Sequence, residues 1–466
     1  MTDDIYTLSA SELVEAYRAK RLSPVEATEA ALARIDAHND AINAYLLVDA
    51  DGARAAARGS EARWAKGEPA GLVDGVPTSI KDVLLSRGWP TLRGSKTVDP
   101  DQPWDDDAPA VARMREHGAV FLGKTTTPEF GWKGVTDCPV SGITRNPWNL
   151  ERTPGGSSGG ASASLAAGMG ALAFGTDAGG SIRIPCSFAG VFGLKPSFGR
   201  VPAYPPSPFS TLSHVGPMSR TVADAALMLN VIAEPDARDW FALPAEQRDY
   251  RAGLDDGIAG LKVAFSPALG YAEVDAEVAD LVAAAARVFE ELGAIVEQTD
   301  PGFENPGAAM KTIAWAGLGH GLGPLIDGKR DLVDPGLLAL IDEGATITLD
   351  AYFDAVATRN ALGGHMKRFH TDYELLLTPT LPITAFPVGR FMPEGDDPRQ
   401  WIDWLPFTFP FNMTGQPAAS IPCGFTREGL PVGLQIVGPM HRDALVLRAA
   451  RAFETARPFA DRRPAL

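Results

Sequence analysis

The sequence alternates segments of helical periodicity with short apolar runs, and this alternation strongly limits what the chain can fold into. Apolar side chains recur at helical spacing in four clear segments: residues 23–39, 222–233, 275–294 and 442–454. Short runs with the character of buried strands lie between them: AVFL at 119, ALAF at 171, LKVAF at 261, ELLL at 374 and PVGLQIVG near 432. Runs of that length between helices predict an α/β fold, with a largely parallel or mixed sheet covered by helices.

The 466 residues contain no Pro/Gly/Ser-rich linker and no charge run that would divide the chain, so we expect one domain over residues 1–466. The helix expected near residue 23 has the clearest start. Ser23 fits an N-cap, Pro24 fits the first helical position, and Glu26 completes a capping box. In such a fold the functional side chains are expected on loops at the strand ends.

Composition argues against several classes of function. A formal net charge of −16 disfavours a nucleic-acid partner, because a surface that follows phosphates needs clustered Lys and Arg. The N-terminal sequence has no basic segment before an apolar run, and no stretch approaches the roughly 20 apolar residues of a membrane helix. We therefore expect a cytoplasmic protein without membrane attachment. Three cysteines are too few and too scattered for a disulfide framework or a zinc site and are expected to be buried thiols: Cys138, Cys186 and Cys423.

Residues 118–125, GAVFLGKT, match the phosphate-loop pattern G-x-x-x-x-G-K-[ST]. A phosphate loop follows a strand and consists of small residues whose amides wrap an anion. Here the four middle residues are themselves the expected strand, and APAVARMREH before Gly118 has the pattern of a helix that ends at a glycine cap. The context therefore argues against nucleotide binding.

Residues 156–160, GSSGG, fit the nucleophile-elbow pattern G-x-S-x-G, with Ser158 at its centre. An elbow needs a strand immediately before it, and RNPWNLERTP, with its two prolines, is a poor strand. A Ser-His-Asp triad on Ser158 would also need a histidine, for which five lie downstream: His214, His320, His365, His370 and His441. An esterase of this kind is one alternative.

Three further segments belong together: LVDGVPTSIKD up to Asp82, PGGSSGGASASLAAG from Pro154, and GTDAGGSIR from Gly175. In order and spacing they resemble the amidase signature family, whose catalytic centre is a Ser-Ser-Lys triad. The resemblance extends to GKTTTPEFG at 123–131, GLKPSFGRVP at 193–202, and the later LLTPTLP and GQPAASIP. In this family the GKT is structural.

The resemblance implies a single α/β/α domain, with a large mixed, mostly parallel sheet sandwiched between helices. Its signature core covers residues of about 65–240, and a variable region of about 300–410 is expected to shape the substrate pocket. The implied reaction is hydrolysis of a carboxylic amide to a carboxylate and ammonia or an amine through an acyl-serine. No metal or organic cofactor is implied.

By this resemblance Ser181 is the nucleophile, Ser157 relays its proton and follows a cis peptide bond, and Lys81 is the terminal base. A lysine acts as a base only when neutral, so the pKa of Lys81 must lie well below its usual value, and burial at the end of VPTSI would lower it. The implied oxyanion hole consists of four backbone amides: Ala178, Gly179, Gly180 and Ser181. Supporting roles are implied for Ser158, Asp177 and Arg183.

Aromatic residues near the motifs indicate a small aryl or aliphatic amide as substrate, and the pocket candidates are Phe130, Trp132 and Phe188. The family also contains the A subunit of glutamyl-tRNA(Gln) amidotransferase, which works as a glutaminase with partner subunits, and this is the alternative function. A catalytically silent relative is disfavoured because all three triad positions are filled. Homodimers are common among relatives, so a homodimer is the expected assembly.

Overall fold

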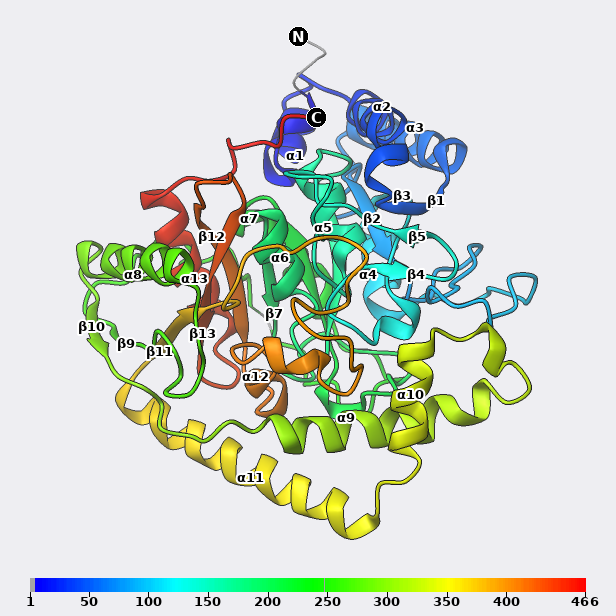
Figure 1. The fold of residues 1–466 in the computed structure, drawn as a ribbon. Helices are drawn as coiled ribbons and strands as arrows, with labels where there is room; N and C mark the ends of the chain where they lie inside the picture. The colour runs from blue at the N-terminus through cyan, green and yellow to red at the C-terminus, as the bar shows by residue number, and fades with distance from the viewer. Residues whose placement is uncertain (1–4, 247) are drawn as a thin grey trace.

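The computed structural model describes residues 5–246 and 248–466, and its centre is one large sheet (Figure 1). Eleven strands are joined in the order β1-β3-β2-β6-β8-β7-β12-β13-β11-β9-β10. Their bounds are β1 Tyr45–Val48, β2 Pro77–Lys81, β3 Val120–Thr125, β6 Leu172–Asp177, β7 Phe192–Lys195, β8 His214–Ser219, β9 Lys262–Phe265, β10 Ile295–Gln298, β11 Leu375–Pro379, β12 Ala418–Phe425 and β13 Pro431–Val437. A separate small sheet pairs β4 (Asp137–Cys138) with β5 (Gly142–Ile143).

Helices cover both faces of the large sheet. Their bounds are α1 Ala10–Arg18, α2 Pro24–Ile42, α3 Ala50–Lys66, α4 Pro109–Glu116, α5 Gly159–Ala166, α6 Arg183–Ala189, α7 Val222–Ile232, α8 Ala276–Glu291, α9 Gly307–Leu322, α10 Pro335–Gly344, α11 Leu349–Asp372, α12 Pro410–Met413 and α13 Asp443–Ala456. Alternate side chains of β6 face opposite layers: Leu172 and Phe174 pack with α7, and Ala173 packs with α5 and α6.

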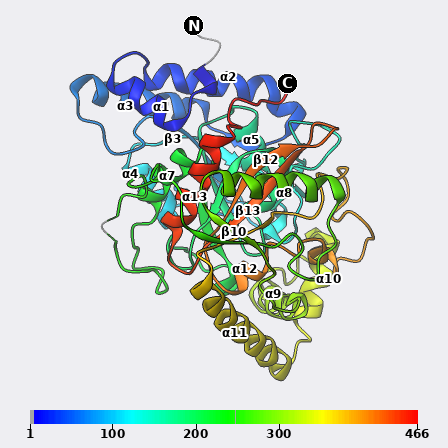
Figure 2. The same cartoon turned by 90° about the vertical axis from the view of Figure 1, so that its left-hand side faces the viewer.

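Figures 1 and 2 show α1–α3 at one end of the molecule and α9–α11 at the opposite end. Helices α10 and α11 each pack on α9, and apolar side chains of the three helices share a cluster with Phe130, Trp132 and Ile184 from the signature segments. These helices belong to the region of about 300–410 that is expected to shape the substrate pocket, and they pack against the signature segments. Within residues 5–246 and 248–466, no helix combines the length and the apolar character needed to cross a membrane.

The α/β architecture with a large mixed sheet between helices is confirmed. Parallel pairing occurs in two blocks, β3-β2-β6 and β11-β9-β10. The strands between these blocks pair antiparallel, as does β1 at the edge. The hairpin of β12 and β13 accounts for one of these antiparallel pairs, because two strands joined by a short turn must run in opposite directions.

The four expected helices correspond to α2, α7, α8 and α13, and the five expected strands to β3, β6, β9, β11 and β13. The capping box is present, since Ser23 Oγ accepts from the N–H of Glu26 (3.2 Å) and Glu26 Oε2 accepts from the N–H of Ser23 (2.8 Å). Cys138 and Cys186 are buried free thiols, whereas Cys423 is partly exposed.

The GKT of the phosphate-loop pattern lies inside the sheet, on the fully buried strand β3. Lys124 Nζ donates to the carbonyl of Leu84 (2.7 Å) and to the hydroxyl of Thr91 (2.8 Å). Burial lowers the pKa of this lysine to about 8, against the opposing charge of Asp82. A lysine with these internal partners on a buried strand has a structural role, in agreement with the argument against nucleotide binding.

Gly123→Ala is expected to lower the free energy of unfolding by about 1 to 3 kcal/mol, because overpacking of a tight site has that cost. A Cβ at Gly123 would collide with the carbonyl oxygen of Leu47 on the paired strand β1. Urea denaturation measures the effect. The matched control is Gly59→Ala at an exposed position of α3, where alanine should raise stability by about 0.5 to 1 kcal/mol. Equal stability of the two variants would contradict this role of Gly123.

Candidate active site

Strands β2 and β6 bring the sequence motifs together at one end of the sheet. They are parallel neighbours, with Thr78 paired to Leu172, so their carboxyl ends lie side by side. Lys81 is the last residue of β2 and Asp177 the last of β6. The loop that follows β6 contains Ser181.

The amine of Lys81 is fully buried and surrounded by hydroxyl groups. Its Nζ lies 2.7 Å from Ser157 Oγ, 2.9 Å from Ser158 Oγ and 2.7 Å from Thr176 Oγ1. Burial lowers the pKa of Lys81 well below its ordinary value, and the negative charge of Asp177 opposes this shift without overcoming it. The environment therefore favours the neutral amine.

The two serines beside Lys81 lie at the start of helix α5. The Gly156–Ser157 peptide bond is cis, and Ser158 is the residue immediately before the helix, all of which is buried. A Cβ at Gly156 or Gly160 would approach backbone atoms of neighbouring segments too closely. The glycine-rich stretch is thus a tightly packed turn and helix start, not a flexible linker.

A buried ion pair organises the loop after β6. Arg183 donates to both carboxylate oxygens of Asp177, from Nε at 2.9 Å and from Nη2 at 3.0 Å, and neither side chain is exposed. Asp177 also accepts from the backbone N–H groups of Gly180 (2.7 Å) and Ile182 (3.2 Å), which flank Ser181. Burial by itself would raise the pKa of Asp177, but Arg183 holds it below its ordinary value.

The four backbone amides expected to face a substrate oxygen are not equivalent. The N–H of Gly180 already donates to Asp177, which corrects the assignment of Gly180 to the oxyanion hole. Among the hydrogen bonds formed within the described residues, none uses the N–H of Ala178, Gly179 or Ser181. These three amides are the remaining candidate donors.

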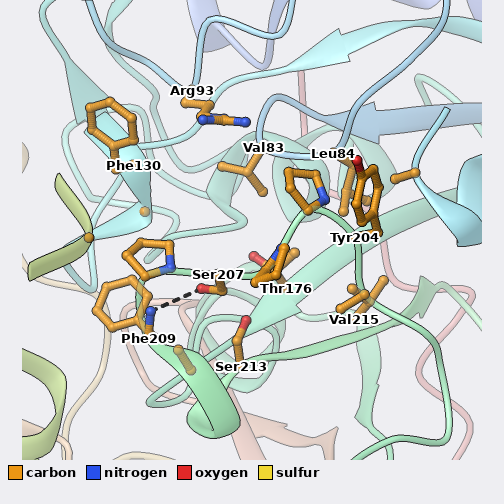
Figure 3. Close-up of a pocket in the computed structure, with 18 of the residues that line it drawn as sticks. Val83, Leu84, Arg93, Phe130, Thr176, Tyr204, Ser207, Phe209, Ser213 and Val215 are labelled. Carbon is orange, nitrogen blue, oxygen red and sulfur yellow. Dashed lines mark hydrogen bonds between the residues drawn. The ribbon is translucent and has the colours of Figure 1, made fainter. Parts of the chain in front are cut away.

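Ser157, Thr176 and Ser181 line a cavity of about 400 Å³. Figure 3 shows a close-up of this cavity, with Thr176 labelled. Apolar side chains form much of the remaining wall: Val83, Leu84, Phe130, Phe209, Val215, Leu322 and Leu325. The backbones of the two serine segments are joined, because the N–H of Ser158 donates to the carbonyl of Ser181 at 3.2 Å. Both serine segments thus border one space large enough for a small molecule.

Two of the three expected pocket aromatics border a cavity next to Ser181. Phe130 lines the 400 Å³ cavity, and Trp132 lines a narrow one of about 20 Å³ that Ser181 also borders. Phe188 lines neither; it is fully buried and stacks on Trp404 with ring centroids 6.1 Å apart. Its assignment to the pocket is therefore corrected, because helix α6 directs this side chain into the core.

Sequence reasoning missed three features of the site: Thr176, Arg93 and the segment 202–208. Thr176 is the third hydroxyl at Lys81, and its place inside GTDAGGS was the available signal. All residues of 202–208 line the 400 Å³ cavity. The four prolines of that segment indicate a loop that cannot pair as a central strand.

The nucleophile-elbow interpretation of Ser158 lacks its geometry. The segment 145–154 forms isolated bridges and turns instead of a strand that leads into the serine. The hydroxyl of Ser158 bonds with Lys81 and with the backbone of Thr176. The nearby His214 directs Nδ1 to backbone carbonyls, one of them that of Asp177 at 3.2 Å.

Comparison with known proteins agrees with this geometry. The family model described as Amidase matches residues 26–447. The chain belongs to the amidase signature family. This member is 41% identical to an acylamidase of Rhodococcus erythropolis, over 99% of this chain and 98% of that protein. It is 38% identical to the A subunit of the glutamyl-tRNA(Gln) amidotransferase of Moorella thermoacetica, over 99% of each chain.

Solved structures give the same family. A bacterial aryl acylamidase of the amidase signature family matches with a TM-score of 0.90 at 33% identity, covering 97% of each chain. A 6-aminohexanoate cyclic dimer hydrolase, complexed with substrate, matches with a TM-score of 0.90 at 32% identity, covering 99% of each chain.

Lys81→Met is expected to change how stability depends on pH in this amidase signature protein. Burial holds the pKa of folded Lys81 well below its unfolded value of about 10.5, so between these two pKa values the unfolded chain binds the extra proton. The contribution of Lys81 to the free energy of unfolding therefore rises with pH, by up to about 1.4 kcal/mol per pH unit, and levels off above the unfolded pKa.

Urea titrations at several values between about pH 8 and 10 measure this effect. The difference in unfolding free energy, native protein minus Lys81→Met, should grow as the pH rises. Lys262→Met, at an exposed lysine of β9, provides the baseline for loss of a lysine. A difference that stays constant or shrinks with rising pH would show that Lys81 is not held neutral.

Proposed function

We propose that the protein is an amidase that hydrolyses the C–N bond of a carboxylic amide through an acyl-serine on Ser181. The observation that carries the proposal is the buried amine of Lys81, 2.7 Å from the hydroxyl of Ser157, which lines the same cavity as Ser181. A neutral amine beside a hydroxyl has the features of a base that activates a nucleophile. Membership of the amidase signature family supports the same chemistry.

In the first step Ser181 Oγ attacks the carbonyl carbon, its proton passes to Ser157, and the proton of Ser157 passes to Lys81 Nζ. The hydroxyl of Ser158 donates to the carbonyl of Thr176 at 3.2 Å, so its proton is engaged elsewhere. Ser157 is therefore well suited to donate to the lone pair of the neutral amine. Within the described residues no hydrogen bond joins the hydroxyls of Ser157 and Ser181, and catalytic hydrogen bonds are often loose until substrate binds.

Negative charge develops on the former carbonyl oxygen as the tetrahedral intermediate forms. The N–H groups of Ala178, Gly179 and Ser181 would stabilise it, since fixed backbone donors need no reorganisation during the reaction. The proton then returns from Lys81 through Ser157 to the leaving nitrogen, and ammonia or an amine departs. Water attacks the acyl-serine with the same base and donors, and the carboxylate is released.

The substrate we propose is a small aryl or aliphatic amide. A cavity of about 400 Å³ with apolar side chains such as Val83, Phe130 and Phe209 in its wall suits an apolar acyl or amine group. The names of two relatives, acylamidase and aryl acylamidase, support the same class.

A second candidate is the function of the A subunit of glutamyl-tRNA(Gln) amidotransferase, which the 38% identity to the Moorella thermoacetica protein favours. In that role the same residues would release ammonia from glutamine in an assembly with partner subunits. Rapid hydrolysis of simple aryl amides by the isolated chain would favour the amidase, whereas ammonia release that depends on copurified partners would favour the amidotransferase.

Ser181→Ala, Ser157→Ala and Lys81→Ala are each expected to lower kcat by about 10³-fold or more, since each removes one member of the group that activates the nucleophile. Release of ammonia or aniline from a panel of aliphatic, aryl and arylacetic amides and anilides provides the measurement. The control is Thr358→Ala, which removes an exposed hydroxyl of α11 outside the cavity, and for which kcat should stay within a few-fold of the native value.

Mass spectrometry of protein quenched during turnover should detect the acyl group on Ser181 in the native chain and not in Ser181→Ala. Full activity of Ser181→Ala would contradict the assignment and favour an esterase-like site on Ser158.

A further inference from the structure

Arg93 lies where two cavities meet. It lines the 400 Å³ cavity together with Ser157 and Ser181, and it also lines a second, more polar cavity of about 620 Å³. Phe130 and Leu325 are common to both spaces. Figure 3 shows the Arg93 side chain at the edge of the first cavity, near Phe130 and Val83. Its guanidinium is thus placed beside the proposed substrate.

The Arg93 guanidinium has no protein partner among the hydrogen bonds and ion pairs of the residues that the structure describes. Burial lowers its pKa, and the more distant charge of Asp82 opposes this effect. Arginines that are more deeply buried than Arg93 are well bonded: Arg183 binds Asp177, and Arg220 donates to the carbonyls of Gly170 (2.7 Å) and Leu8 (2.6 Å). A partly desolvated guanidinium without such partners is stabilised by an anion that enters the cavity.

The backbone fixes Arg93 firmly in relation to the proposed catalytic residues. Asp82, directly after strand β2, accepts from the N–H groups of Leu92 and Gly94, both at 3.2 Å. The carbonyl of Arg93 accepts from the N–H of Phe130 at 2.7 Å. Arg93 has φ +56°, a left-handed conformation that is uncommon for a residue with a Cβ. Such conformations persist where surrounding structure enforces them and are frequent at ligand sites.

Acidic residues near the second cavity do not neutralise Arg93. Three carboxylates line that cavity, and all are exposed: Asp99, Asp105 and Asp106. In the described part of the chain none of them forms an ion pair with Arg93, and exposed charges are strongly screened by water and salt. The guanidinium therefore keeps its capacity for a ligand.

We propose that Arg93 binds a carboxylate of the substrate, so that the preferred amide has an acidic group separated from the scissile carbonyl by an apolar spacer. This rests on the proposed amidase function and makes its substrate class narrower. The planar guanidinium fork matches a carboxylate in two parallel hydrogen bonds. The apolar wall, including Val83 and Phe209, would contact the spacer. Arg93 is a specificity residue in this proposal, since it acts away from the reacting atoms.

The test measures equilibrium binding by calorimetry to the Ser181→Ala protein, in which no turnover disturbs the titration. The ligands are 4-acetamidobenzoate and the monoanilides of succinic, glutaric and adipic acid, each paired with its neutral methyl ester. In at least one pair the carboxylate should bind about tenfold or more tightly than the ester. Adding Arg93→Gln should reduce this preference by about 10- to 100-fold, and Arg93→Lys should restore part of it.

The control is Arg87→Gln, which removes an exposed arginine from the same loop and should keep the carboxylate preference. Equal binding of acid and ester in every pair would overturn the carboxylate site, and so would an Arg93→Gln protein that loses both ligands equally. The ratio of carboxylate binding to ester binding in the Ser181→Ala protein, which retains Arg93, tests the proposal even if Arg93→Gln fails to fold. Failure of the proposed amidase function is a separate result, because it would appear as absent turnover in the native chain while these binding ratios are unaffected.

Discussion

The hydrogen bonds between the buried amine of Lys81 and three hydroxyl groups are the interaction on which the rest of the site depends. An ammonium buried among hydroxyls loses its hydration without gaining an opposite charge, so the neutral form is favoured. This arrangement requires β2 and β6 to be parallel neighbours and α5 to start very close to both strands. The close approach is possible because positions such as Gly156 and Gly160 lack a Cβ that would collide with neighbouring backbone.

Asp177 is the nearby charge that could undo this arrangement, since its attraction raises the pKa of Lys81. The structure directs the carboxylate away from the amine. Arg183 binds both of its oxygens, and Asn412 Nδ2 donates to it at 2.8 Å. The same carboxylate fixes the amides of Gly180 and Ile182, so it shapes the loop of Ser181 while leaving the amine without an ion pair. One buried ion pair thus serves both the geometry of the loop and the protonation state of the lysine.

The sequence predicted the fold class, the main helices and strands, and the meeting of the three motifs, because these depend on local periodicity and on segments with a recognisable order. It could not give strand direction in the middle of the sheet, since an apolar run indicates burial and contains no information on which neighbour it pairs with. The sequence also could not show that a side chain binds the N–H of Gly180. Nor could it show the direction of the Phe188 side chain, which depends on the packing of α6. The single-domain division, the homodimer and the cytoplasmic location stay predictions.

Sequence analysis also missed residues of the cavity wall, because segments that are distant in the sequence form this wall together. The wall of the 400 Å³ cavity combines the turn at Arg93, the segment 202–208 and the end of α9, which no sequence window joins. The proposed base, in contrast, is the buried last residue of β2, and the proposed nucleophile lies in the loop that follows β6. Side chains in the wall can therefore differ in size and charge without altering the hydroxyl environment that lowers the pKa of Lys81. Most side chains that would contact a substrate are thus distinct from the hydroxyl groups that surround the proposed base.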